Sequence, residues 1–234
     1  MFDFNDYVEN YLNKITDSWL TPRGIMFSEG FALTTAILET KSNLVLESGT
    51  AYGGSCEMMA IICEKTKILT TDMHNMYDSE NYSKERLGKY PNVLCKKENS
   101  LKLFPEVLSK YTQNNVFVFI DGPKGQDAID FADYLINSYS EKISLVAIHD
   151  IKYDSKNAET IRQKYNNCIF TDDPNGVFNS FREKIDSHML ELNKQKSKLT
   201  KSSLDREKGA GYLQQVLEET PRGFGLALIK GPFK

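Results

Sequence analysis

The chain has 234 residues, of which 40% are hydrophobic, and its 29 basic and 32 acidic residues give a formal net charge of −3. A single hydrophobic core serves chains of up to roughly 250 residues, so we expect one globular domain with at most a small appended subdomain. The composition excludes a mainly disordered chain, a polycation that coats nucleic acid and an acidic tail.

The cysteines and the N-terminal segment predict a cellular location. The four cysteines form no Cys-x-x-Cys pair and no His/Cys cluster with the spacing of a zinc site. Asp3, Asp6 and Glu9 lie where a secretory signal carries positive charge, and no run approaches the roughly 20 apolar residues of a membrane span. We therefore expect a cytoplasmic protein with reduced cysteines and no membrane partner.

Short apolar runs of strand length alternate along the chain with stretches long enough for crossover helices. The predicted strands are 44–47, 67–71, 92–96, 116–120, 144–148 and 168–171. This alternation is typical of a doubly wound α/β fold, in which helices cover both faces of a mostly parallel sheet. A last run, 223–230, predicts a further strand that joins the sheet edge in antiparallel orientation.

Two helical regions flank this alternation. Residues 1–40 are expected to form an N-terminal helical cap of two or three helices over the ligand edge of the sheet, and residues 41–234 the main domain. A helical insertion is predicted at 178–222, where the stretch from Arg182 to Lys208 holds eight basic and five acidic residues. It reads either as a solvated helix or dimer-packing arm, or as a contact for an anion or a nucleic acid.

The segment from Glu47 to Ser55 turns the first strand directly into a helix predicted over 56–64. Gly49 at the end of the strand lets the backbone approach a ligand, and the N-terminus of a helix favours an anion such as a carboxylate. The glycine spacing differs from the Gly-x-Gly-x-x-Gly of dinucleotide-binding folds. The loop therefore predicts a ligand site, with a tight turn that binds nothing as the alternative.

Asp72 ends the second predicted strand, about 20 residues after this loop. An acid at that place in a doubly wound fold accepts hydrogen bonds from the two vicinal hydroxyls of a ribose. A lone surface aspartate is the alternative. The preceding loop favours the ribose role.

With these features the chain resembles the class I S-adenosylmethionine-dependent methyltransferases, and it looks closest to the catechol and caffeoyl-coenzyme A O-methyltransferase group. The resemblance covers about residues 40 to 171 and the last strand, and is most specific between Glu47 and Ser55. It implies a Rossmann-like sheet of seven strands, the last one antiparallel, with S-adenosylmethionine as the cofactor. It also implies the cofactor-binding residues Glu47, Gly49, Thr50, Tyr52, Gly53, Ser55, Asp72, Asn99, Ser100 and Asp121.

Each part of the cofactor has its expected partners in this resemblance. Glu47 and the loop backbone approach the methionine half, and Ser55 approaches its carboxylate. Asp72 holds the ribose, and residues 98–100 hold the adenine.

The ends of the fourth and fifth predicted strands carry the residues expected to do chemistry. Asp121 and Lys124 follow the fourth strand, and His149 and Asp150 follow the fifth, so both pairs face the crevice of the first loop. By the resemblance, Asp121 holds a divalent ion and Lys124 is the base that accepts the acceptor's proton. The alternative is a Gly-Pro turn that carries ordinary surface charges.

His149-Asp150 departs from the catechol-type pattern, which has an Asp-Asn pair at this place. A His-Asp ending resembles bacterial sugar and antibiotic O-methyltransferases instead. His149 therefore has three open roles: a base that Asp150 orients, a ligand for a softer metal such as manganese or zinc, or a polar strand terminus. Asp121 and Asp150 are the expected ligands of a metal, Mg²⁺ or Mn²⁺.

The function expected from these features is O-methylation of a small hydroxylated molecule, a sugar or a secondary metabolite. Neither a nucleic acid nor a membrane is an expected partner. The chain is expected to form a homodimer. Methylation of nitrogen or metal-dependent oxidation on the same fold is one alternative. A non-catalytic nucleotide-binding or assembly subunit, with residues 178–208 as its working surface, is another.

Overall fold

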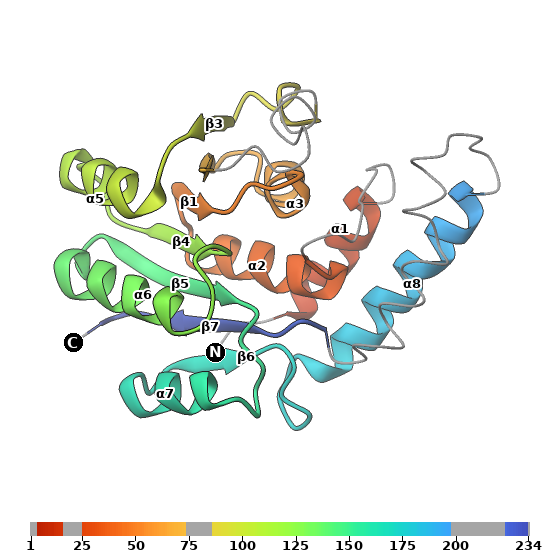
Figure 1. Cartoon of the computed structure of the whole chain (residues 1–234). Coiled ribbons are helices and arrows are strands. Elements are labelled where there is room, and N and C mark those ends of the chain that lie inside the picture. Colours follow the sequence, from red (N-terminus) through yellow and green to blue (C-terminus); the bar gives the residue numbers. More distant parts are fainter. Residues whose placement is uncertain (1–3, 16–24, 74–85, 198–222, 234) are drawn as a thin grey trace.

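The structure is a computed structural model that describes residues 4–15, 25–73, 86–197 and 223–233. Within these residues seven strands form one sheet in the order β3-β2-β1-β4-β5-β7-β6 (Figure 1). The strands are β1 (Leu44–Ser48), β2 (Lys67–Asp72), β3 (Val93–Lys97), β4 (Val116–Ile120), β5 (Ile143–His149), β6 (Cys168–Phe170) and β7 (Leu226–Lys230). Strands β1 to β5 pair in parallel, while β7 pairs antiparallel with both β5 and β6. The predicted fold class is confirmed.

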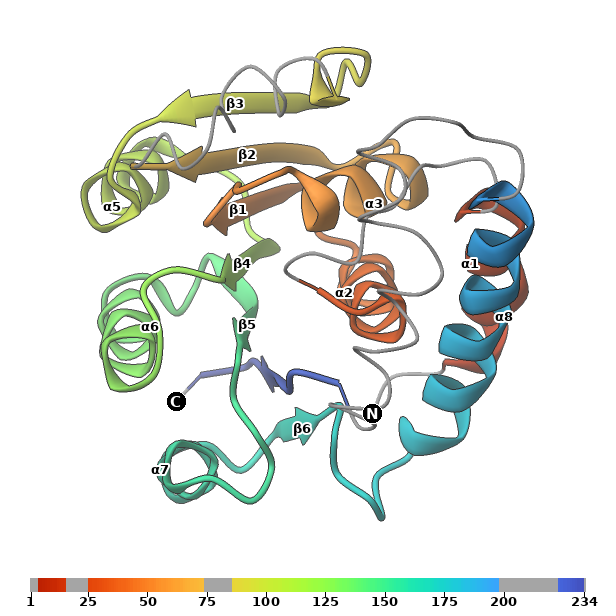
Figure 2. The same cartoon turned by 45° about the vertical axis from the view of Figure 1, so that its right-hand side comes forward.

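Helices cover both faces of the sheet (Figures 1 and 2). One face carries α1 (Asn5–Ile15), α2 (Phe27–Glu39), α3 (Gly54–Ile62) and α8 (Asn179–Ser197). The other face carries α5 (Ser100–Lys110), α6 (Gln126–Tyr139) and α7 (Lys156–Lys164).

Strand β4 shows why the apolar runs of this sequence form central strands. Phe117 and Phe119 belong to the hydrophobic cluster on the α2 face, while Val116, Val118 and Ile120 belong to the cluster on the α6 face. All five side chains are fully buried. A parallel strand that is buried on both faces has no polar side and therefore reads as a continuous apolar run.

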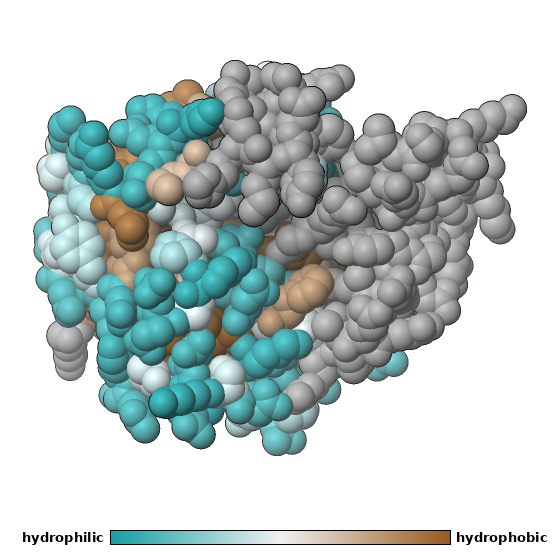
Figure 3. Space-filling model, viewed as in Figure 1, coloured by the Kyte–Doolittle hydropathy of each residue, from teal (hydrophilic) through white to brown (hydrophobic). Residues whose placement is uncertain are grey.

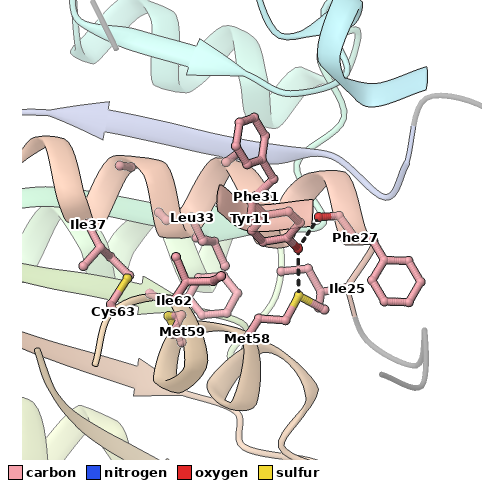
Figure 4. Close-up of a cluster of buried hydrophobic side chains, with 14 of the residues drawn as sticks. Tyr11, Ile25, Phe27, Phe31, Leu33, Ile37, Met58, Met59, Ile62 and Cys63 are labelled. Carbon is pink, nitrogen blue, oxygen red and sulfur yellow. Dashed lines mark hydrogen bonds between the residues drawn. The ribbon is translucent and has the colours of Figure 1, made fainter. Parts of the chain in front are cut away.

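Helix α2 is fixed against its neighbours by close packing (Figure 4). The Tyr11 hydroxyl donates to the Phe27 carbonyl at 2.7 Å and lies 3.3 Å from the Met58 sulfur. A Cβ at Gly30 would lie 2.1 Å from that sulfur, so only glycine lets Met58 of α3 pack here. The first turn of α2 is thereby held near the C-terminal edge of the sheet.

The boundaries of the elements shift by a few residues from those predicted. Helix α3 starts at Gly54 and not at Cys56, and β7 starts at Leu226 and not at Gly223. The later start of β7 has a physical cause, because the Glu29 carboxylate binds the backbone N–H groups of Phe224 and Gly225 at 2.8 and 2.9 Å. Of the predicted insertion at 178–222, α8 covers 179–197, and residues 198–222 lie outside the described residues.

Hydrophilic residues predominate among the described residues on the face drawn in Figure 3, with small apolar patches between them. None of the described helices has the length and apolar character needed to cross a membrane.

Candidate functional site

The candidate site lies where the order of the strands reverses, between β1 and β4. The strand ends Ser48, Asp72, Ile120 and His149 meet at one edge, which is where open α/β sheets bind ligands. A pocket of about 320 Å³ opens at this edge, a volume within the range of small-molecule sites. Its lining residues are Ser48, Gly49, Thr71, Asp72, Met73, Glu98, Asn99, Ser100, Leu101, Gly122 and Pro123.

The β1–α3 loop, residues 49–53, has an unusual backbone. Gly49, Ala51 and Gly53 have φ angles of +99°, +43° and +75°, a region that residues other than glycine rarely adopt. A Cβ at Gly49 would lie 3.1 Å from the carbonyl carbon of Asp121. Glycine therefore lets this loop pass directly against the end of β4.

Strand β2 holds one side of this loop. The backbone N–H groups of Gly49 and Thr50 donate to the Thr71 carbonyl at 2.9 and 3.3 Å. The N–H of Ala51 donates to Asp72 Oδ2 at 2.9 Å. Asp72 thus supports the loop through one carboxylate oxygen while it also lines the pocket.

Glu47 carries a buried carboxyl group that is only half satisfied. The Ser55 hydroxyl donates to Oε1, while Oε2 has no hydrogen-bond partner within the described part of the chain. Burial raises the pKa of Glu47 to about 7, even though the bond from Ser55 acts in the opposite direction. Such a group either keeps a proton or receives a hydrogen bond from a ligand.

The pocket combines polar and apolar walls. The side chain of Asn99 caps α5 by accepting from the Leu101 N–H at 2.9 Å, and the Ser48 hydroxyl donates to the Ser100 hydroxyl at 2.7 Å. Met73 and Leu101 are 48% and 50% exposed and supply apolar surface beside these groups. Apolar walls with a few placed polar groups are typical of a small-molecule site.

The structure brings four of the predicted cofactor residues into this pocket: Gly49, Asp72, Asn99 and Ser100. The other six do not line it: Thr50, Tyr52 and Gly53 belong to the loop itself, Glu47 to β1 and Ser55 to α3, and Asp121 follows β4. Thr50 and Thr70 bond each other through their hydroxyls at 2.6 Å, and the Tyr52 carbonyl accepts from Arg86. Gly53 forms the N-cap of α3.

A cluster of charged side chains lies beside the loop, at the ends of β4 and β5. Asp121 accepts from Lys124 and from His149 Nδ1, the latter at 2.6 Å. The Lys124 ammonium also lies 2.7 Å from Asp150 Oδ2. His149 is 2% exposed, whereas half of the Lys124 side chain is exposed.

Glu29, at the first turn of α2, completes this cluster and was missed by the sequence analysis. Its Oε2 lies 3.3 Å from His149 Nε2 and accepts from the Met26 N–H at 2.9 Å. Burial alone would raise the pKa of Glu29, but its bonds to His149 and to backbone N–H groups lower it. The sequence signal for Glu29 is weak, because it is one acid in the first turn of a helix whose other residues are mostly apolar.

His149 is held as a cation. Burial would lower the pKa of its imidazole, but the carboxylates of Asp121 and Glu29 outweigh burial and raise the pKa to about 10. Both ring nitrogens therefore carry protons at neutral pH, and in this arrangement the ring neither accepts a proton nor ligates a metal. The acid that orients it is Asp121 at 2.6 Å, and not the predicted Asp150, which lies at 3.6 Å.

The same contacts bear on the predicted metal site at Asp121 and Asp150. Atoms of Asp121, His149 and Asp150 lie within 4.8 Å of one another, which is close enough to surround one ion. The two carboxylates, however, already bind the Lys124 ammonium and the His149 imidazolium. With these ion pairs in place the three residues do not fit a divalent cation, and the proposed mechanism does not use one.

Among comparisons with known proteins, those with solved structures find matches. No family model and no curated protein matches the sequence. Among solved structures, the chain is similar to a candidate caffeoyl-CoA O-methyltransferase from Staphylococcus aureus, with 16% identity, 98% of this chain and 92% of that one covered, and a TM-score of 0.46. It is also similar to the O-methyltransferase TomG from Streptomyces achromogenes, solved with SAM, with 13% identity, 99% and 92% covered, and a TM-score of 0.45.

The matches also include the 23S rRNA methyltransferase ErmE, at 15% identity, with 50% of this chain and 44% of that one covered and a TM-score of 0.36. The expectation that nucleic acid is not a partner stays a prediction. At these identities and TM-scores the likenesses assign no function to this chain.

Proposed function

We propose that this chain is an S-adenosylmethionine-dependent methyltransferase that methylates a hydroxyl group of a small molecule, a sugar or a secondary metabolite. The observation that carries the proposal is the pocket at the strand reversal, where Gly49 brings the β1–α3 loop against Asp121. A donor in this pocket would lie beside the only charged cluster that the described residues place at the ends of β4 and β5.

Residues of the pocket, together with the buried Glu47 and Ser55, fit the parts of the donor. The carboxylate of Asp72 would accept from the ribose hydroxyls, and Met73 and Leu101 would flank the adenine. The unsatisfied oxygen of Glu47 would accept from the ammonium group of the methionine half. Ser55 would bind the carboxylate of that half once its hydroxyl leaves Glu47.

When bound, S-adenosylmethionine supplies a methyl group that is already electrophilic, so the protein has two tasks. The first is to align the acceptor oxygen with the methyl group, which can contribute roughly 7–11 kcal/mol through proximity. The second is to remove the proton of the acceptor hydroxyl. The strand ends would align the acceptor, and the charged cluster would accept its proton.

Lys124 is the group best placed for the proton. Burial would lower its pKa, but Asp121 and Asp150 outweigh burial and raise it. The Lys124 ammonium therefore stabilises a nearby hydroxyl as it loses its proton, and the neutral amine, which grows in population as the pH rises, accepts that proton. His149, locked between Glu29 and Asp121, holds Asp121 in place for this task.

Binding of S-adenosylhomocysteine tests the proposal. At a concentration 100 times its dissociation constant it should stabilise the wild type by about 2.7 kcal/mol in thermal unfolding. Asp72→Asn keeps an oxygen for the Ala51 N–H but loses the carboxylate, so its dissociation constant should rise about tenfold or more. Asp130→Asn, an exposed change on α6, is the matched control and should bind as the wild type does.

An unchanged melting curve of the wild type at saturating S-adenosylhomocysteine would refute the donor site and favour a non-catalytic subunit. If the donor binds, incubation of the wild type with hydroxylated acceptors should release one equivalent of S-adenosylhomocysteine per methylated oxygen. Methylation found on nitrogen or on RNA would keep the donor site and overturn the acceptor class.

A further inference from the structure

The segment that leads into β3, residues 86–90, lies directly on the β1–α3 loop. Arg86 Nη1 donates to the carbonyl of Tyr52 at 3.3 Å. The Leu87 side chain covers Gly53, where an added Cβ would lie 3.0 Å from Leu87 Cδ1 and 3.1 Å from Cγ. Arg86 and Leu87 are 9% and 1% exposed, so these contacts are shielded from water.

Glu57 in the first turn of α3 anchors this segment. Its Oε2 lies 2.5 Å from Arg86 Nε, and its Oε1 accepts from the Tyr90 hydroxyl at 2.9 Å and from Lys89 at 3.1 Å. Glu57 is 1% exposed. A buried carboxylate with this many partners has little freedom to move, so residues 86–90 and the start of α3 form one unit.

The contacts matter because the loop between them is strained. Ala51 has a φ of +43°, and it lies between two glycines that also have positive φ. Such a conformation persists only where its surroundings fix it. Asp72 holds Ala51 on one side, and Arg86 with Leu87 holds Tyr52 and Gly53 on the other.

We infer that Arg86 and Glu57 are positioning residues for the methyl donor, which keep the β1–α3 loop in the conformation that accepts it. The inference rests on the proposed function, because it assigns the loop to the donor. The guanidinium suits the task, since its planar fork reaches the Glu57 carboxylate and the Tyr52 carbonyl at the same time. A lysine at this place keeps a charge for Glu57 but has no second arm for the carbonyl.

Arg86→Lys is therefore the informative variant. We expect its dissociation constant for S-adenosylhomocysteine to rise about tenfold, while its melting temperature stays near that of the wild type. Lys14→Met is the matched control, because it removes an ion pair, 2.6 Å long, to Glu64 just beyond the other end of α3. The control should bind S-adenosylhomocysteine as the wild type does.

Amide hydrogen exchange without any ligand gives a readout that does not depend on the donor. Exchange at residues 50–57 should become faster in Arg86→Lys and stay unchanged in Lys14→Met, and exchange in α6 should change in neither. Leu87→Ala serves as a second variant that alters no charge and should also speed exchange in this segment.

The outcomes separate the two proposals. If the wild type does not bind S-adenosylhomocysteine, the proposed function fails, and the role of Arg86 and Glu57 in donor binding fails with it. If the wild type binds it and Arg86→Lys binds equally well with unchanged exchange at 50–57, the positioning role of Arg86 and Glu57 is wrong and the donor site stands. Faster exchange throughout the chain would also overturn the inference, because it would show a general loss of stability.

Discussion

Glu47 is the residue whose protonation state the donor should change. Its pKa of about 7 in the free protein means that a large part of the population is neutral at neutral pH, while an ammonium group beside it favours the carboxylate. Binding should then release a proton whenever the pH lies below about 7, so affinity for S-adenosylhomocysteine should rise by up to about tenfold per pH unit from about pH 5.5 to about pH 7 and then level off.

Isothermal titration calorimetry in buffers of different ionisation enthalpy measures both the affinity and the proton release. Glu47→Gln is the matched variant, because it keeps an acceptor for Ser55 and cannot ionise. It should bind more weakly and show no such pH dependence. If the wild-type affinity did not vary over this pH range, Glu47 would not bind the ammonium group of the donor.

Lys124 is the residue on which the chemical step should depend. Lys124→Met removes the amine and keeps most of the side-chain length, so kcat should fall by about 10²- to 10⁴-fold while the dissociation constant for S-adenosylhomocysteine stays within about twofold. Because Asp121 and Asp150 raise the Lys124 pKa, wild-type kcat should rise towards alkaline pH. The measurement is turnover of an acceptor that the wild type methylates. Lys164→Met is the control, because it also removes a lysine from an ion pair with an aspartate. If Lys124→Met turned over the acceptor at the wild-type rate, Lys124 would not be the base.

At the scale of elements, the central strands could be predicted and the edges less well. The predicted strand 116–120 matches β4. Both of its faces are buried, so it contains no polar residue and its ends are clear in the sequence. The start of β7 could not be predicted, because it depends on a carboxylate from α2 that takes the N–H groups of Phe224 and Gly225. Edge positions are set by such tertiary contacts and not by the local pattern.

The same division holds for the elements that build the candidate site. Asp72, Asp121 and His149 could be expected at one edge because parallel strands all end there. Glu29 and Arg86 could not, since their contacts with His149 and Glu57 span 120 and 29 residues and depend on how α2 and residues 86–90 pack. The orienting partner of His149 also followed from packing, because the neighbouring strand brings Asp121 closer to the ring than the adjacent residue Asp150.

At the scale of the whole molecule, a buried carboxyl group joins α8 to the rest of the fold. Asp186 accepts from the backbone N–H and the hydroxyl of Ser28, at 3.0 and 2.7 Å, and so caps the first turn of α2, where Met26 has no side-chain oxygen to do so. α8 also lies along α1 and α2 (Figure 2). Asp186 is 4% exposed, and burial raises its pKa to about 7 in spite of the bonds from Ser28.

This raised pKa predicts that stability falls as the pH rises. Below its unfolded-state pKa, near 3.8, Asp186 is protonated in both states; between that value and about 7 the folded state keeps a proton that the unfolded state has lost. The free energy of unfolding should therefore decrease from about pH 4 to about pH 7 at this site, with an upper bound of about 4 kcal/mol if the whole shift is expressed.

Asp186→Asn isolates this contribution, because the amide keeps an acceptor for the Ser28 N–H and carries no charge at any of these pH values. Urea unfolding of the wild type and the variant across the same pH range gives two curves, and their difference removes the effects of Glu47 and His149, which both proteins share. The variant should gain stability relative to the wild type as the pH rises and reach a constant difference above about pH 7, where Asp186 is ionised in both states. Parallel curves would mean that Asp186 keeps its charge inside the fold, and the junction of α8 with α2 would then depend on an ionised cap at the N-terminus of α2.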